Sequence, residues 1–213
     1  MCTEIKFIFF DLGNVLLKFD HSRLVTQVAA LGGKSEDETK QILFHEPHDL
    51  ENRFERGELT VDEFHRAFCD LMACDAQKEE LMWALADIFW LNTPIASLLS
   101  KLVTLDFPRA ILSNTCEAHW EFANREFRIV NDFFDQRVLS YEEKSMKPDS
   151  KIYQSAISLA KQLVDCEANE IFFTDDRQEN VDAARAAGMQ AELFVNTSML
   201  ARQLVEGGVQ LSP

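Results

Sequence analysis

Six polar side chains in the sequence carry chemical groups that could act together, although they lie far apart along the chain. They are Asp11, Ser113, Asn114, Lys147, Asp175 and Asp176. Carboxylates are hard oxygen ligands of the kind that Mg²⁺ prefers, and a carboxylate can also attack phosphorus to form an aspartyl-phosphate. The hydroxyl, amide and ammonium groups can bind phosphoryl oxygens. Because phosphoryl transfer requires little beyond positioning and charge neutralisation, this set favours that reaction.

Short apolar runs end directly before most of these side chains. The runs 5–10, 110–112, 170–173 and 191–194 are predicted strands, and 136–139 is a fifth candidate. They are largely apolar rather than alternating, which is typical of parallel strands buried on both faces. Three of the polar clusters therefore begin where a predicted strand ends.

Helical patterns separate the strands. Residues 149–163 carry apolar side chains at helical spacing, and the alanine-rich segment 180–187 ends at Gly188. The alternation of strands and helices predicts an α/β fold with a Rossmann-like parallel sheet and right-handed crossovers. Since parallel strands bring their carboxyl ends to one edge, the clusters are expected to meet in one crevice, which Lys147 can join from its loop.

Residues 20–93 interrupt this alternation, with several helix starts and no convincing strand. Two capping-box patterns are Ser35 with Glu38 and Thr60 with Glu63. Apolar residues at helical spacing from Leu81 to Phe89 predict a further helix. We predict an all-helical cap of residues 20–93, inserted into an α/β core of residues 1–19 and 94–213. Such an insert would lie over the carboxyl ends of the strands, where open α/β sheets bind ligands.

The polar clusters resemble, in order and spacing, the four motifs of the haloacid dehalogenase-like (HAD) hydrolase superfamily. The matching segments are Asp11-Leu12-Gly13-Asn14-Val15, Ser113-Asn114, Lys147-Pro148 and Thr174-Asp175-Asp176-Arg177-Gln178-Glu179-Asn180. Each motif alone is common, but four in order over nearly the whole chain are specific, and the insert resembles that family's helical cap. Together with Glu55-Arg56-Gly57-Glu58-Leu59, the first motif most resembles sugar-phosphate phosphatases of the α-D-glucose-1-phosphatase type.

This resemblance implies a Mg²⁺-dependent phosphatase that acts on a small phosphorylated metabolite, such as a sugar phosphate. Asp11 is the implied nucleophile. The implied metal ligands are Asp11, the backbone carbonyl of Gly13 and Asp176, with Asp175 contributing directly or through water. The groups implied to bind the phosphoryl oxygens are Ser113, Asn114 and Lys147.

One position departs from the family's pattern. Most phosphatases of this family carry an aspartate two residues after the nucleophile as general acid and base, and Gly13 stands there in this chain. General acid–base catalysis is typically worth about 10²–10⁴-fold, so its loss slows the covalent step without abolishing it. The proton must come from the cap or from water, or the leaving group must depart easily. Asp20, His21 and Arg56 are the cap-side candidates.

Two other functions remain open on the sequence. A 2-haloacid dehalogenase also uses an aspartate nucleophile and needs no acid at position 13. Against it, the Asp175-Asp176 pair suits a metal that dehalogenation does not require. A non-catalytic binding or regulatory protein of the same fold is the second alternative, because Gly13 has replaced the expected carboxylate.

Composition excludes several classes of partner and compartment. The 213 residues, 46% of them hydrophobic, suit one core with an insert. Lys and Arg number 21 against 36 Asp and Glu, and a net charge of −15 disfavours nucleic acids and anionic membranes. The sequence shows no bilayer-length apolar run and no signal-peptide pattern, and its five scattered cysteines favour reduced thiols. We expect a cytoplasmic enzyme; the oligomeric state is left open.

Overall fold

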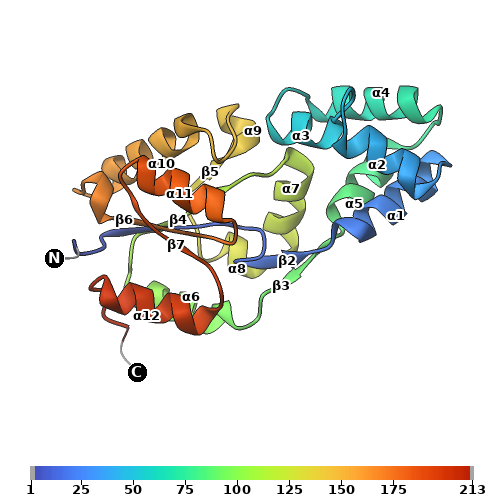
Figure 1. Ribbon diagram of the computed structural model, residues 1–213. Coiled ribbons are helices and arrows are strands. Elements are labelled where there is room, and N and C mark those ends of the chain that lie inside the picture. The colour runs from blue at the N-terminus through green and yellow to red at the C-terminus, as the bar shows by residue number, and fades with distance from the viewer. Residues whose placement is uncertain (1–2, 212–213) are drawn as a thin grey trace.

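The structure is a computed structural model that describes residues 3–211. Its elements are β1 (Phe7–Phe10), β2 (Leu17–Phe19), α1 (His21–Gly32), α2 (Glu36–Phe44), α3 (Leu50–Glu55), α4 (Val61–Met72), α5 (Lys78–Ala86), β3 (Phe89–Leu91), α6 (Ile95–Thr104), β4 (Arg109–Ser113), α7 (Glu117–Glu126), α8 (Arg128–Asn131), β5 (Arg137–Leu139), α9 (Ser140–Glu143), α10 (Ser150–Leu163), the 3₁₀ helix η1 (Ala168–Glu170), β6 (Ile171–Asp175), α11 (Gln178–Ala186), β7 (Gln190–Leu193) and α12 (Thr197–Glu206). Figure 1 shows the sheet at one end and α1 to α5 at the other.

A five-stranded parallel sheet forms the core, in the order β5-β4-β1-β6-β7. The predicted α/β fold is therefore confirmed, including the fifth strand. The first strand along the chain, β1, is the middle strand of the sheet, and Phe10 is in register with Ile111 of β4 and Thr174 of β6. The residues that follow these three strands therefore meet at one edge.

The two faces of the sheet are buried by different helices. Alternate residues of a strand point to opposite faces. Accordingly, Phe7 and Phe9 pack with apolar residues of α10 and α11, while Ile8 and Phe10 pack with α6, α7 and α12. All four residues of β1 are buried, which explains why this strand is continuously apolar.

The helices α1 to α5 enclose an apolar cluster of their own, which includes Phe54, Phe64 and Phe68. Both predicted capping boxes are present, at the starts of α2 and α4. The assignment of residues 20–93 to a separate cap stays a prediction, and below "the cap" means α1 to α5.

The prediction that residues 20–93 contain no strand is wrong. The helix predicted to continue to Phe89 ends at Ala86, and Phe89–Leu91 forms β3, which pairs antiparallel with β2. The Phe89 ring contacts the Phe19 ring at a centroid distance of 6.1 Å. Apolar residues at helical spacing could not reveal this, because β3 is extended only through its pairing with a strand distant in sequence. The resulting ribbon joins the cap to the core.

A second junction holds the turn after α3 against α9 of the core. The Lys144 ammonium donates to the carbonyl of Gly57 at 2.6 Å. Gly57 has a positive φ of 66°, and a Cβ at this position would lie 2.2 Å from the carbonyl oxygen of Tyr141. Only glycine fits this close approach between cap and core.

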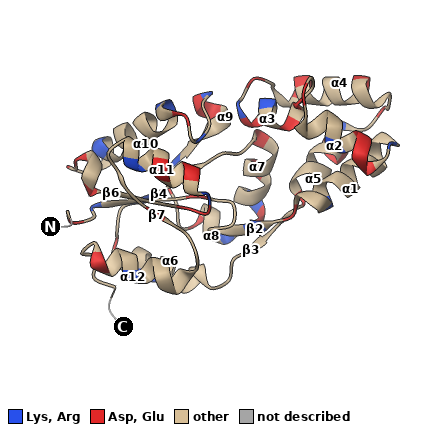
Figure 2. Cartoon of the chain, viewed as in Figure 1, with Lys and Arg blue, Asp and Glu red and all other residues tan. Residues whose placement is uncertain are grey.

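Basic side chains do not gather on one element. In Figure 2, Lys and Arg lie scattered among Asp and Glu along both the core and the cap. Within residues 3–211, no helix combines the length and the apolar character needed to cross a membrane.

We predict that Gly57→Ala destabilises the protein more than Gly33→Ala. Both glycines have nearly the same positive φ, 66° and 64°, but nothing lies within 4 Å of a Cβ added at Gly33. The free energy of unfolding of the Gly33 variant should fall by about 1–2 kcal/mol, because alanine is strained in the left-handed conformation. The free energy of unfolding of the Gly57 variant should fall by at least about 1 kcal/mol more, because its Cβ would also clash with the carbonyl of Tyr141. Urea unfolding measures both; equal losses would show that the cap–core contact is not tight.

Candidate active site

Three strand ends position the predicted residues. Asp11 follows β1, Ser113 ends β4 and Asp175 ends β6. The Asp11 N–H donates to the carbonyl of Thr174, which extends the sheet by one residue and fixes the start of the loop. The predicted convergence is seen: Asp11, Gly13, Ser113, Asn114, Lys147 and Asp176 line one cavity of about 360 Å³. Asp175 lies beneath it, fully buried.

The Lys147 ammonium occupies the centre of the site. It lies 2.8 Å from Oδ1 of Asp11 and 2.6 Å from Oδ2 of Asp175, and it donates to the carbonyl of Leu112 at 3.0 Å. These three partners use all the protons of an ammonium group. Burial alone would lower the pKa of Lys147, but the two carboxylates outweigh it and raise the pKa, so the lysine is charged.

The pKa of the Asp11 carboxyl is also raised, but here burial is the cause and the charge of the neighbouring Lys147 opposes it. Burial raises the pKa of Asp11 to about 7, with a further contribution from Asp175, while Lys147 holds the pKa down. A buried carboxylate beside a single cation is a better nucleophile than one in water, because fewer water molecules must be displaced from it before it attacks.

The two acidic residues after β6 have different partners. Asp175 accepts hydrogen bonds from Lys147, from the Arg177 N–H and from the Asn180 amide, which occupy both of its oxygens. Asp176 accepts one hydrogen bond, from the Asn14 amide to Oδ2 at 2.8 Å. Asp176 therefore keeps more hydrogen-bonding capacity free for a metal ion, whereas Asp175 holds Lys147.

Hard oxygen donors converge beside Lys147. Carboxylate oxygens of Asp11, Asp175 and Asp176 lie within 4.8 Å of one another. In the described chain, Oδ2 of Asp11 and Oδ1 of Asp176 accept no hydrogen bond from protein groups. With the carbonyl of Gly13 on the same cavity wall, this donor set fits Mg²⁺, which takes a few carboxylates and keeps positions for waters and phosphate oxygens.

The Asn114 side chain braces the lysine loop. Its amide donates to the carbonyl of Lys147 at 2.9 Å, and its Oδ1 accepts the N–H of Lys147 at 2.7 Å. This pair of bonds occupies the side chain that the sequence proposed for phosphate binding and leaves its backbone N–H for that purpose. The Ser113 hydroxyl lies on the cavity wall and contacts the carbonyl of Asn114 at 3.2 Å.

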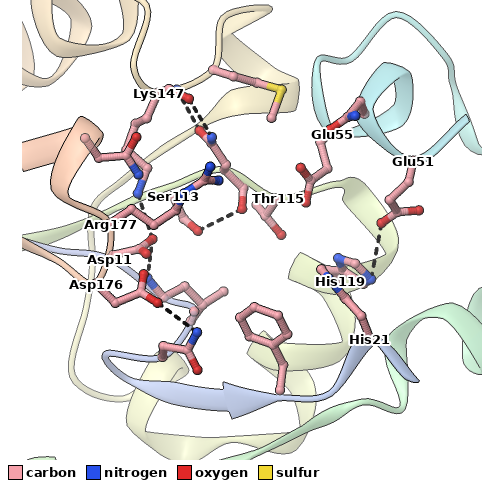
Figure 3. A pocket seen from close by; sticks show the side chains of 18 of the residues that line it. Asp11, His21, Glu51, Glu55, Ser113, Thr115, His119, Lys147, Asp176 and Arg177 are labelled. Atoms are coloured by element: carbon pink, nitrogen blue, oxygen red, sulfur yellow. Dashed lines mark hydrogen bonds and ion pairs between the residues drawn. The ribbon is translucent and has the colours of Figure 1, made fainter. Parts of the chain in front are cut away.

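The opposite wall of the cavity contains residues to which the sequence assigned no role in the site. Glu51 and Glu55 come from α3, Thr115 from the loop after β4 and His119 from α7 (Figure 3). The available signals were the spacing of the two glutamates, one helical turn apart in α3, and the inclusion of Glu55 in the cap segment that carries the family resemblance. Of the suggested proton donors, His21 lines the cavity, whereas Asp20 caps α1 and Arg56 pairs with Asp149.

Glu51 is buried without a hydrogen-bond partner among residues 3–211. It is 4% exposed, and burial together with the nearby Glu55 raises its pKa to about 8. His119 approaches it at 3.7 Å, but burial lowers the pKa of that imidazole to about 4. The histidine is neutral, and its Nε2 lies 3.2 Å from the carbonyl of Leu85. Both groups are therefore uncharged at neutral pH.

The packing leaves little room for a side chain at position 13. A Cβ built on Gly13 would lie 2.9 Å from Cε1 of Phe19. The Phe19 ring, held by β2 and by contacts with His21 and Phe89, fills the space in which a side chain at position 13 would begin.

We therefore predict that Gly13→Asp destabilises the protein instead of restoring a working acid. Overpacking of this kind costs about 1–3 kcal/mol. The cost should shrink by about 1 kcal/mol in a Phe19→Ala background, because the contact is then absent. Urea unfolding of the two single variants and the double variant measures this coupling. Additive losses would mean that Phe19 does not exclude the side chain.

A second prediction concerns pH and stability. Below the pKa of a glutamate in the unfolded protein, about 4.3, Glu51 is protonated in both the folded and the unfolded protein. Above it the unfolded state releases the proton first, so stability falls as pH rises towards the folded pKa of about 8. Glu51→Gln should reduce this fall between about pH 5 and pH 8, by on the order of 3 kcal/mol. Thermal and urea unfolding across this range measure it; parallel curves for variant and wild type would contradict it.

Comparisons with known proteins agree with this geometry. A D-ribitol-5-phosphate phosphatase of Bacteroides thetaiotaomicron is 26% identical over 193 residues, covering 87% of this chain and 90% of that protein. The sesquiterpene phosphatase astK of Aspergillus oryzae is 29% identical over 220 residues, covering 96% of this chain and 99% of that protein. A crystal structure of a HAD family enzyme from B. thetaiotaomicron, in complex with magnesium and inorganic phosphate, matches with a TM-score of 0.75 and 26% identity, covering 89% and 93% of the two chains.

The sequence profile of one family covers most of the chain. It matches residues 5–188, a range that includes all four motifs and the helices between the first two. With the parallel sheet and the convergent carboxylates, this match establishes that the chain belongs to the haloacid dehalogenase-like hydrolase family.

Proposed function

We propose that this protein is a Mg²⁺-dependent phosphatase that hydrolyses the phosphate ester of a small metabolite through an aspartyl-phosphate on Asp11. The observation that carries the proposal is the Asp11 carboxylate itself. It is fixed by Lys147, has one oxygen without a protein hydrogen bond, and faces a cavity beside Asp176. Both curated relatives described above are phosphatases, which supports the same reaction here.

Asp11, Asp176 and the carbonyl of Gly13 would hold the metal ion, and Asp175 would act through Lys147. The ion would neutralise charge on the phosphate so that an anionic nucleophile can approach it. The magnesium and phosphate complex of the family member from B. thetaiotaomicron supports this cofactor.

The protein groups divide the remaining work. Asp11 attacks phosphorus, and the bond to the leaving oxygen breaks. Ser113 and the backbone N–H of Asn114 bind the phosphoryl oxygens, and Lys147 balances the charge on those oxygens and on Asp11. Water then hydrolyses the aspartyl-phosphate, which releases inorganic phosphate and restores Asp11.

The cavity favours an alcohol of moderate size with both polar and apolar parts. Phe19, Phe44, Phe89 and Met146 line it together with the glutamates of α3. A sugar or polyol phosphate can satisfy the polar groups, and the apolar wall can contact a carbon chain. We propose a sugar phosphate as the first substrate class to test.

Replacement of the nucleophile tests the reaction. Asp11→Asn should lower Mg²⁺-dependent phosphate release by at least about 10³-fold, because an amide cannot form the covalent intermediate. Asp37→Asn, at an exposed acid of α2, is the matched control and should behave as wild type. Phosphate release is measured on a panel of sugar, polyol and terpenoid phosphates, with and without EDTA.

Two results would reject the proposal. One is an absence of Mg²⁺-dependent phosphate release by the wild type across the panel. The other is full activity of Asp11→Asn. Release of halide from 2-haloacids without Mg²⁺ would instead support a dehalogenase.

A further inference from the structure

The proposed reaction leaves one proton unaccounted for. When the phosphorus–oxygen bond of an alkyl phosphate breaks, the leaving oxygen is strongly basic and needs a proton from a positioned acid. Gly13 cannot supply one, and the Phe19 ring fills the space where its side chain would be. A protein group that donates this proton must therefore lie on another wall of the cavity.

Glu55 lies on the cap wall of the cavity. It is the last residue of α3, and its side chain points into the space that Ser113 and Thr115 border from the core side (Figure 3). The charges that act on it, Lys147 and Arg177, belong to the phosphate end of the cavity. Glu55 thus faces the same space as the expected phosphoryl group, from the side where the leaving group must lie.

A buried hydroxyl fixes Glu55 relative to the core. Ser140, at the start of α9, donates to the carbonyl of Glu55 at 2.7 Å and accepts the N–H of Thr115 at 2.9 Å. One side chain therefore ties the backbone of Glu55 to the loop that follows β4. Gly57 and Lys144 hold the next turn of the cap against the same helix. The position of Glu55 is set by the core, as a catalytic group requires.

Burial brings the pKa of Glu55 close to neutral pH. Burial raises its pKa to about 7, opposed by Lys147, Arg177 and Arg56. A general acid works best when its pKa lies near the operating pH.

We infer that Glu55 is the general acid that replaces the missing carboxyl at position 13. As Asp11 forms its bond to phosphorus, the electron pair of the breaking phosphorus–oxygen bond goes to the leaving oxygen. The Glu55 proton moves to that oxygen, which gives a neutral alcohol and a Glu55 carboxylate. In the second step this carboxylate takes a proton from the attacking water, which restores Glu55 as inorganic phosphate forms.

Other cavity groups are less suited to this role. Glu51 is deeply buried and faces His119. His119 is neutral with its Nε2 at the carbonyl of Leu85, and burial also lowers the pKa of His21. Arg177 does not release a proton under physiological conditions.

The test compares two substrates of similar size but different leaving groups. Benzyl phosphate releases a strongly basic alkoxide, whereas p-nitrophenyl phosphate releases a weakly basic phenolate that needs no proton. Glu55→Gln should lower kcat/KM for benzyl phosphate by about 10²–10⁴-fold and change that for p-nitrophenyl phosphate little. Wild-type turnover of benzyl phosphate should fall as pH rises and Glu55 loses its proton, and this alkaline limb should be absent from the variant.

Glu58→Gln is the matched control, since it neutralises an exposed carboxyl three residues further on, which pairs with Arg53 outside the cavity. It should keep the wild-type preference between the two substrates. Equal losses with both substrates in Glu55→Gln, or a selective loss in Glu58→Gln instead, would overturn the inference. So would a wild type that hydrolyses p-nitrophenyl phosphate but not benzyl phosphate. The inference rests on the proposed function, and a wild type without Mg²⁺-dependent activity on either substrate would reject that function instead.

Discussion

The buried ammonium of Lys147 is the interaction on which the site depends. A cation removed from water is strongly destabilising unless it is paired and fully hydrogen-bonded. Here Asp11, Asp175 and a strand carbonyl satisfy it, and each comes from a different strand end. These groups can meet only when β1, β4 and β6 are adjacent in one parallel sheet. The charge arrangement around Asp11 is therefore a consequence of this strand order.

This arrangement also divides the polar residues between support and chemistry. Asn114 and Asn180 both use their amides to hold charged neighbours, the first at the backbone of Lys147 and the second at the carboxylate of Asp175. Asp11 and Asp176, in contrast, each have one oxygen that accepts no hydrogen bond within residues 3–211. Residues of one motif thus have different roles. An amide or carboxylate that already hydrogen-bonds a neighbouring protein group cannot use the same atoms to bind a ligand.

The sequence predicted the features that depend on local residue patterns and on the order of the strands. Buried parallel strands read as apolar runs, and their ends placed Asp11, Ser113 and Asp176 on one cavity. It could not predict β3, whose extended form depends on β2, or Glu55, which reaches the cavity only because α3 docks on α9. Both depend on contacts between segments distant in sequence. A short helix with two glutamates otherwise resembles an ordinary solvated surface.

A proton donor on the cap changes how catalysis is controlled. An acid beside the nucleophile is present whether or not the substrate is enclosed. Glu55 is in place only while the contacts of Ser140, Gly57 and Lys144 hold α3 against the core. Departure of a basic alcohol then requires that α3 stay packed against the core. Because Gly13 has no acid, cleavage of the phosphorus–oxygen bond depends on Glu55 of the cap. The cap helix that contacts the alcohol then also supplies its proton.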